Sequence, residues 1–303
     1  MKHFGAIAVV VVYLCAALFA QDKYAVVVGV NKYDALASLQ AGVNDAEKIG
    51  AYYSGIGFRV WMLDDRQSAR MDQPGLSNLE RVMANVKETA AGHPVKELVF
   101  FFAGHGVQIN GQNWLCFPET DIKSQTGMLN VDTKLLPWLR DLGADLTMVY
   151  LDACRNDLGG MRAAGVERGL TVQGLVDEPT ASNKPSSNHN IAVFYAAKPG
   201  SFSYEKPDGT NGFFTETLVE ALQADATHNI ADLYKYLRTA LPERTEKAFG
   251  RPQIPNLGGD LDIGVAFSKG KVDLSAMDTG AKLYVESDQS GATVSINGIK
   301  RGQ

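Results

Sequence analysis

Phe102-Ala103-Gly104-His105-Gly106 closes one apolar run of this chain, and Leu151-Asp152-Ala153-Cys154-Arg155-Asn156 closes another about fifty residues later. Each stretch places a reactive side chain directly after a segment with the composition of a buried strand. The carboxyl ends of parallel strands lie at one edge of a sheet, so we expect His105 and Cys154 to be neighbours. A thiol beside an imidazole is a nucleophile beside its general base, and the two stretches therefore predict nucleophilic catalysis.

Strand-like and helix-like segments alternate on both sides of these stretches. Continuous apolar runs, which are typical of parallel strands buried on both faces, cover residues 24–30, 58–63, 97–103, 147–151 and 191–197. Helical periodicity covers residues 44–53, 77–91, 135–142, 213–223 and 231–241. A hairpin is predicted over 108–118, with its turn at Asn110-Gly111. The alternation predicts an α/β fold with a mostly parallel sheet, helices on both faces and a small C-terminal β segment.

Length and charge narrow the class of protein. The 303 residues can hold one large domain and a small one. The formal net charge is −5, and no cluster of lysine or arginine stands out. Nucleic acid is therefore a poor candidate partner.

The first twenty residues are predicted to be a signal peptide. An apolar stretch over residues 4–20 follows Lys2 and His3, and charge returns at Asp22. We expect cleavage near residue 20 and export to the periplasm, the cell surface or the medium. A membrane anchor is the alternative, although the stretch is short for a span, and membrane contact is then confined to this segment. The residues around Cys15 match a lipoprotein signal less well than they match an ordinary signal peptide.

Cysteine usage argues against disulfides and zinc. Cys15 leaves with the signal peptide, so that only Cys116 and Cys154 remain. Cys116 lies in an apolar, strand-like run and is expected to be a small buried hydrophobe. No Cys-x-x-Cys or paired-histidine spacing is present, so we expect no metal site and no cofactor.

The motifs together resemble the caspase-like peptidases, the broad family of caspases, metacaspases and bacterial orthocaspases. The resemblance spans residues 22–265, and the domain is placed at residues 22–267, most similar to the bacterial metacaspase and orthocaspase type. It is carried by the His105 and Cys154 stretches and by Gly29-Val30-Asn31-Lys32-Tyr33, Asn44-Asp45-Ala46, Tyr195-Ala196-Ala197-Lys198-Pro199-Gly200 and Gly212-Phe213-Phe214-Thr215.

The resemblance implies a cysteine endopeptidase that acts on a peptide or protein substrate. Cys154 is then the nucleophile, His105 the base, and the backbone N–H groups of Gly106 and Cys154 bind the oxyanion. No acid has a convincing third position, so we expect a dyad. Ser203 and Tyr204 are placed in the substrate groove. The alternatives are a CHAT-type peptidase, which also pairs His-Gly with a strand-end cysteine, and a catalytically inactive binding module at the cell surface.

Substrate preference is predicted from departures from the caspases, which cut after aspartate because basic side chains line their pocket. The matching positions here are Leu39 and Glu205. Metacaspases and orthocaspases carry acids at the positions of Asp45 and Asp152, and they prefer arginine or lysine. The resemblance therefore implies cleavage after basic residues, because paired carboxylates bind a guanidinium well.

Residues 155–190 are rich in glycine, serine and proline and are predicted to be a long loop. Self-cleavage is expected there after Arg162, Arg168 or Lys184, since exposed flexible segments are preferred cleavage sites. The alternative is an intact loop that borders the groove. Some relatives require calcium, but the carboxylates of this loop are better explained as solvated side chains than as a calcium site.

The C-terminal residues 281–303 are predicted to form a separate unit. Short strands are predicted over 282–286 and 293–296, and residues 268–280 form a polar linker. Residues 290–298 resemble the PEGA repeat of bacterial surface and exported proteins. We therefore expect residues 281–303 to form a partial PEGA-like β domain.

Overall fold

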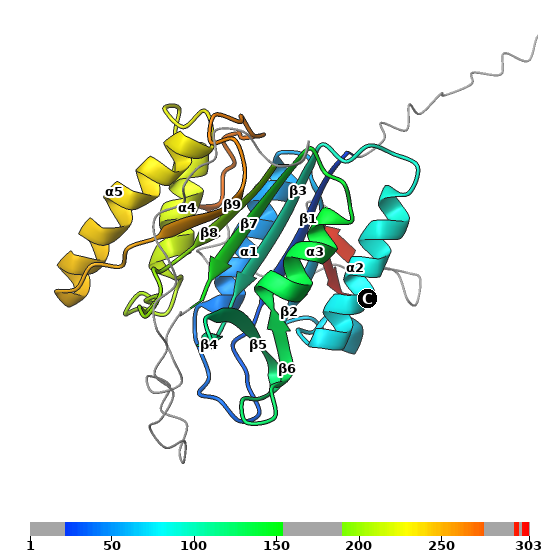
Figure 1. Ribbon diagram of the computed structural model, residues 1–303, viewed down its shortest axis with the longest axis horizontal. Coiled ribbons are helices and arrows are strands. Elements are labelled where there is room, and N and C mark those ends of the chain that lie inside the picture. The colour runs from blue at the N-terminus through cyan, green and yellow to red at the C-terminus, as the bar shows by residue number, and fades with distance from the viewer. Residues whose placement is uncertain (1–21, 154–189, 276–293, 297–298, 303) are drawn as a thin grey trace, which may run out of the picture.

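A computed structural model describes residues 22–153, 190–275, 294–296 and 299–302. A six-stranded sheet in the order β2-β1-β3-β7-β8-β9 forms its centre (Figure 1). Its strands pair in parallel except for the antiparallel pair of β8 and β9. The predicted mostly parallel sheet is confirmed. The strands are β1 (Lys23–Gly29), β2 (Arg59–Asp64), β3 (Glu97–Ala103), β7 (Leu146–Asp152), β8 (Asn190–Tyr195) and β9 (Asn256–Asp260).

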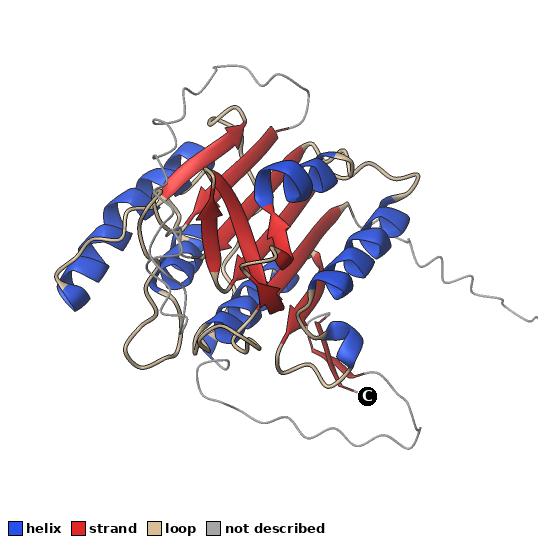
Figure 2. Cartoon of the chain, turned by 60° about the horizontal axis from the view of Figure 1, so that its bottom comes forward, coloured by secondary structure: helices blue, strands red, loops and turns tan. Residues whose placement is uncertain are grey.

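Helices cover both faces of the sheet, as the alternating sequence pattern predicts (Figure 2). Successive strand residues point to opposite faces, so Val27 packs with one core and Val26 with the other. Buried residues of α1 (Gly42–Gly55), α4 (Phe213–Gln223) and α5 (Ile230–Phe249) belong to the first core. Those of α2 (Leu76–Ala90) and α3 (Leu136–Arg140) belong to the second.

A second, three-stranded antiparallel sheet carries the residues that follow His105. It consists of β4 (Gly106–Ile109), β5 (Gln112–Asp121) and β6 (Thr126–Asn130). Asn110 and Gly111 have φ angles of 52° and 77°, which is the conformation of a type I′ hairpin turn. The predicted hairpin is confirmed. Strand β6 was not predicted, because its five residues contain no continuous apolar run.

Two further elements differ from the sequence expectations. Strand β9 has the sequence Asn-Leu-Gly-Gly-Asp, which has little strand propensity, and it forms only because its backbone pairs with β8. Periodicity predicts a helix over 231–241, but α5 continues through Pro242 to Phe249. Leu241 and Thr245 are fully buried, so packing on both sides of the proline maintains the helix.

Shorter elements complete the description. A 3-10 turn η1 (Arg70–Asp72) precedes α2, and a π-helical turn η2 (Val131–Leu135) leads into α3. Near the C-terminus, β10 (Val294–Ile296) and β11 (Ile299–Gly302) pair antiparallel. The predicted strand over 282–286, the signal peptide over 1–20 and the loop over 155–190 fall outside the described residues, apart from Asn190 in β8. Among the helices that are described, none is long and apolar enough to span a membrane.

The part of the expected linker that is described, residues 268–275, runs against the main body. The Lys269 Nζ donates a hydrogen bond of 2.7 Å to the Ala224 carbonyl, directly after α4. The backbone N–H of Val272 donates to Gln223 Oε1 at 2.8 Å. A lysine at the C-terminal end of a helix satisfies carbonyl groups that have no partner within the helix.

Candidate active site

The two motif strands end side by side at the carboxyl edge of the main sheet. Strand β3 ends at Ala103 and β7 at Asp152, and these two residues are register partners. The Gly104 N–H donates to the Asp152 carbonyl at 3.2 Å. The chain therefore reaches His105 from one strand and Ala153 from the next. Cys154 follows Ala153 but lies outside the described residues.

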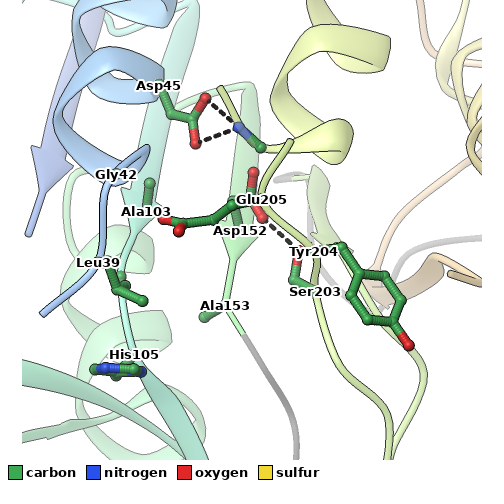
Figure 3. Close-up of a pocket in the computed structure, with 12 residues that line it drawn as sticks. Leu39, Gly42, Asp45, Ala103, His105, Asp152, Ala153, Ser203, Tyr204 and Glu205 are labelled. Atoms are coloured by element: carbon green, nitrogen blue, oxygen red, sulfur yellow. Dashed lines mark hydrogen bonds between the residues drawn. The ribbon is translucent and has the colours of Figure 1, made fainter. Parts of the chain in front are cut away.

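A small cavity of about 70 Å³ lies between these strand ends. In this view Asp45 lies at one end of it and His105 at the other, with Asp152 between them (Figure 3). The twelve residues that line it come from the start of α1, the ends of β3 and β7 and the segment before α4: Leu39, Gly42, Asp45, Ala103, Gly104, His105, Asp152, Ala153, Ser203, Tyr204, Glu205 and Gly212.

The His105 imidazole is oriented by a backbone carbonyl. Its Nε2 lies 2.7 Å from the Ala37 oxygen. Because a carbonyl can only accept, Nε2 carries the hydrogen, and in the neutral ring Nδ1 keeps the lone pair. Burial lowers the pKa of His105, and the Ala37 carbonyl opposes this by raising it. The sequence did not reveal Ala37 as an orienting group, because a main-chain carbonyl has no side-chain signature.

Tyr33 supports His105 from a second side. The His105 N–H donates to the Tyr33 hydroxyl at 2.7 Å, and the two ring centroids are 4.7 Å apart. A Cβ on Gly104 would lie 2.7 Å from the same hydroxyl. This close approach explains why a glycine precedes the histidine. Tyr33 belongs to a motif that the sequence singled out, but the sequence suggested no role for it.

Asp45 is a buried carboxylate in the first turn of α1. It is 2% exposed, and its Oδ1 accepts hydrogen bonds of 2.9 Å from Asn211 Nδ2 and from the Gly212 N–H. Burial raises the pKa of Asp45 well above its ordinary value, and the charge of Asp152 raises it further. The two amide donors oppose both effects without reversing them.

Asp152 is the second buried carboxylate, at the end of β7. Its Oδ1 accepts from the Ser203 hydroxyl at 2.7 Å, and its Oδ2 accepts from the Thr215 hydroxyl at 2.7 Å. Burial raises the pKa of Asp152, while these hydroxyl donors lower it. A Cβ on Gly212 would lie 2.7 Å from Asp152 Oδ2 and 3.0 Å from Asp45 Oδ2. Both carboxylates therefore face the same small volume.

Glu205 and Leu39, the two residues that the sequence resemblance matches to basic pocket positions of the caspases, both line the cavity. The Glu205 Oε1 accepts from the backbone N–H groups of Gln40 and Ala41, at 3.0 and 2.8 Å. This contact joins the segment before α4 to the segment before α1. Of the described residues that line the cavity, three are carboxylates and none is lysine or arginine.

Ser203 and Tyr204, predicted in the substrate groove, both line the cavity. The hydroxyl of Ser203 is directed at Asp152, whereas the Tyr204 ring points away from it (Figure 3). The Tyr204 ring packs instead on Phe249 at the end of α5, with centroids 5.0 Å apart. Ser203 thus belongs to the carboxylate network, and Tyr204 forms the rim.

Cys116 is fully buried in the small sheet, as expected for a packing residue. Burial raises the pKa of its thiol to about 12, so it is an unreactive thiol at neutral pH. The predicted cleavage positions Arg162, Arg168 and Lys184 lie outside the described residues. Within the residues that are described, no cluster of histidine, cysteine and acidic side chains could hold a metal ion.

Comparison with known proteins identifies the family. Residues 22–261 match the family model described as the caspase domain. The fold is similar to caspase-1 from Spodoptera frugiperda, with a TM-score of 0.55 and 16% identity over 84% of this chain and 93% of that one. It is also similar to a protein from Geobacter sulfurreducens, with a TM-score of 0.56 and 15% identity over 82% of this chain and 100% of that one. Comparison with curated proteins gave no match.

The family match and the fold thus define a caspase-like cysteine peptidase, a class that acts on protein or peptide substrates. The chain belongs to the caspase domain family.

Proposed function

We propose that this protein is an endopeptidase in which Cys154 and His105 form a catalytic dyad, and that it cleaves after arginine or lysine. The observation that carries the proposal is the cavity beside His105, whose described lining residues include Asp45, Asp152 and Glu205 and no lysine or arginine. The position of this cavity beside His105 supports its assignment as the S1 pocket, the site for the side chain that precedes the cleaved bond.

The proposed chemistry begins with the transfer of the Cys154 proton to the imidazole. The thiolate attacks the carbonyl carbon of the substrate, and the resulting imidazolium gives the proton to the leaving amine as the peptide bond breaks. Water then hydrolyses the thioester, with His105 acting again as base. The lone pair on Nδ1 and the lowered pKa support this role, because an unprotonated ring is free to accept the proton of the thiol.

The start of β4 supports the role of Gly106 in binding the oxyanion. Gly106 pairs with Leu115, and the neighbouring bond runs from the Cys116 N–H to the His105 carbonyl. Hydrogen-bonded and non-hydrogen-bonded positions alternate along an antiparallel pair, so Gly106 occupies a non-hydrogen-bonded one. Its N–H is therefore directed away from β5. Cys154 would supply the second donor.

The preference for a basic residue follows from charge. A guanidinium in the pocket would form charge-assisted hydrogen bonds with carboxylates that are already buried and held in position. An aspartate side chain there would meet like charge without a compensating donor, which costs several kcal/mol. The acids Asp45 and Asp152 also favour the metacaspase and orthocaspase type within the family.

Replacement of the dyad tests the mechanism. We expect Cys154→Ala and His105→Ala to lower hydrolysis of a fluorogenic arginyl peptide by at least about a thousandfold, since removal of a dyad member eliminates attack or proton transfer. The matched control is Cys116→Ala, which should retain turnover. An irreversible arginyl inhibitor should label the wild type at Cys154 only. Retained turnover in Cys154→Ala would reject the mechanism, and an unlabelled wild type would favour an inactive binding module.

The proposal also includes export, a PEGA-like tail and self-cleavage. Export rests on the apolar stretch over residues 4–20, and a PEGA-like tail rests on residues 290–298. Self-cleavage after Arg162, Arg168 or Lys184 is tested by mass spectrometry of the incubated wild type beside Cys154→Ala. Equal intact masses in both samples would argue against processing.

A further inference from the structure

Lys48 lies on α1 three residues after Asp45, so the two side chains share one face of the helix. At this spacing an ammonium group can reach a carboxylate and form an ion pair. The structure shows a different arrangement. The Lys48 Nζ donates to Asn211 Oδ1 at 3.0 Å, and Asn211 Nδ2 donates to Asp45 Oδ1 at 2.9 Å.

The Asn211 side chain therefore lies between the two charges, in a fixed orientation. It is 3% exposed, so water does not readily replace its contacts. An amide has one accepting and one donating end, and both ends are used here. The half-buried Lys48 thus has an acceptor, and the buried Asp45 carboxylate has a donor.

A direct contact between Lys48 and Asp45 would have a different consequence for the pocket. A charge-assisted hydrogen bond is about twice as strong as one between neutral groups. An internal ammonium on Asp45 would thus neutralise the carboxylate and compete with the cation of the substrate.

We propose that Asn211 is a positioning residue that keeps Lys48 from pairing with Asp45, and so keeps the S1 pocket open to an arginine or lysine side chain. This inference rests on the proposed function, because it assigns the Asp45 carboxylate to substrate binding. It adds a specificity determinant that contacts the pocket only through Asp45.

The test compares two substitutions that remove the same amide. Asn211→Ala leaves space through which Lys48 can reach Asp45. Asn211→Leu also removes both polar ends but retains a branched side chain between them. Binding of benzamidine, a compact aromatic amidinium, is measured by calorimetry on the purified full chain, and kcat and KM are measured with an arginyl peptide.

We expect Asn211→Ala to weaken benzamidine binding and raise KM by about tenfold or more, with kcat within about twofold, since competition affects ground-state binding. Asn211→Leu should weaken benzamidine binding less than Asn211→Ala does. Adding Lys48→Met to Asn211→Ala should restore most of the affinity, because the competing cation is then absent. Thermal unfolding checks each variant, and Asn211→Ser replaces Asn211→Ala if the latter does not fold.

Two results would overturn the inference. One is unchanged benzamidine binding in Asn211→Ala or Asn211→Ser. The other is a loss that Lys48→Met does not reverse, which would show that Asn211 acts only as a donor to Asp45. Failure of the proposed function has a different signature, namely that the wild type itself neither binds benzamidine nor cleaves after arginine.

Discussion

At the scale of single residues, the carboxylates of the cavity depend on a glycine. Gly212 has a φ of −72°, so an alanine there strains no backbone angle. Its Cβ, however, would lie within 3.0 Å of an oxygen on both Asp45 and Asp152. The two carboxylates must then move apart, away from the positions that their hydrogen-bond donors hold.

We therefore expect Gly212→Ala to raise KM for an arginyl peptide by about tenfold. Displaced carboxylates bind the substrate more weakly, whereas the chemical step is affected less. Gly75→Ala is the matched control, since the Cβ would there have only ordinary contacts of 3.8 Å or more. Steady-state kinetics of both variants test the prediction. A Gly212→Ala enzyme with unchanged KM would show that the carboxylates do not bind the substrate.

The buried carboxylates also predict how stability changes with pH. The folded-state pKa of Asp45 is raised, so the fold binds its proton more tightly than the unfolded chain does. That contribution to stability is fully present below the ordinary pKa and is lost as pH rises through the raised value. At a pH above the raised pKa the wild type therefore carries an ionised, buried group, which lowers the stability of the fold.

We expect Asp45→Asn to melt about 2 °C or more above the wild type at a pH above the raised pKa of Asp45, since the neutral side chain avoids this cost. The difference should shrink as pH falls through the raised pKa, because the wild-type carboxyl then becomes neutral. Thermal unfolding of both proteins over a pH series from alkaline to acidic measures this difference. A difference that stays constant with pH would contradict the assignment.

At the scale of elements, the sequence predicts those strands that are buried on both faces. The run Glu97–Ala103 is such a strand, and it is observed with the predicted bounds as β3. Strand β9 was not predicted, because its pairing with β8 is imposed by contacts distant in sequence. Helix propensity also did not predict that α5 continues to Phe249, because packing around Pro242 maintains the helix there.

Strand β9 leads to a prediction about stability. Gly259 has a φ of +114°, and a Cβ there would lie 2.0 Å from the Ile191 carbonyl oxygen. We expect Gly259→Ala to lower the free energy of unfolding by about 3 kcal/mol or more, since backbone strain and a clash with backbone add.

Gly143→Ala is the control for strain alone. Its φ is +64°, and nothing lies within 4 Å of the added Cβ. This substitution should lower the free energy of unfolding by only about 1 kcal/mol. Urea unfolding measures the free energy of unfolding of both variants. Equal losses would mean that β9 accommodates the added Cβ at residue 259 without a further loss of stability.

At the scale of the whole molecule, the sequence predicts the fold better than the site. Six stretches that carry the family resemblance are spread over the domain, and the described ones surround the sheet edge where β3 and β7 end. His105 was predicted as the base beside Cys154, and Asp45 and Asp152 as a pair of substrate-binding carboxylates. In the structure these three side chains line one cavity. Their side chains have an ionisable signature that can be read from the sequence.

The supporting groups were missed for physical reasons. The Ala37 carbonyl and the Gly212 N–H are backbone atoms, which any residue could supply. Asn211 and Thr215 are polar residues whose contact with a carboxylate is set by the tertiary fold. Such groups can be assigned only when the distances are known.

The measurement that tests the central claim most directly is the P1 profile of the purified full chain on a positional-scanning peptide library, with Cys154→Ala as the blank. The S1 pocket that holds Asp45, Asp152 and Glu205 predicts cleavage after arginine, then lysine, and none after aspartate. Activity after aspartate or after a hydrophobic residue, absent from Cys154→Ala, would contradict the assignment of the three carboxylates to the pocket.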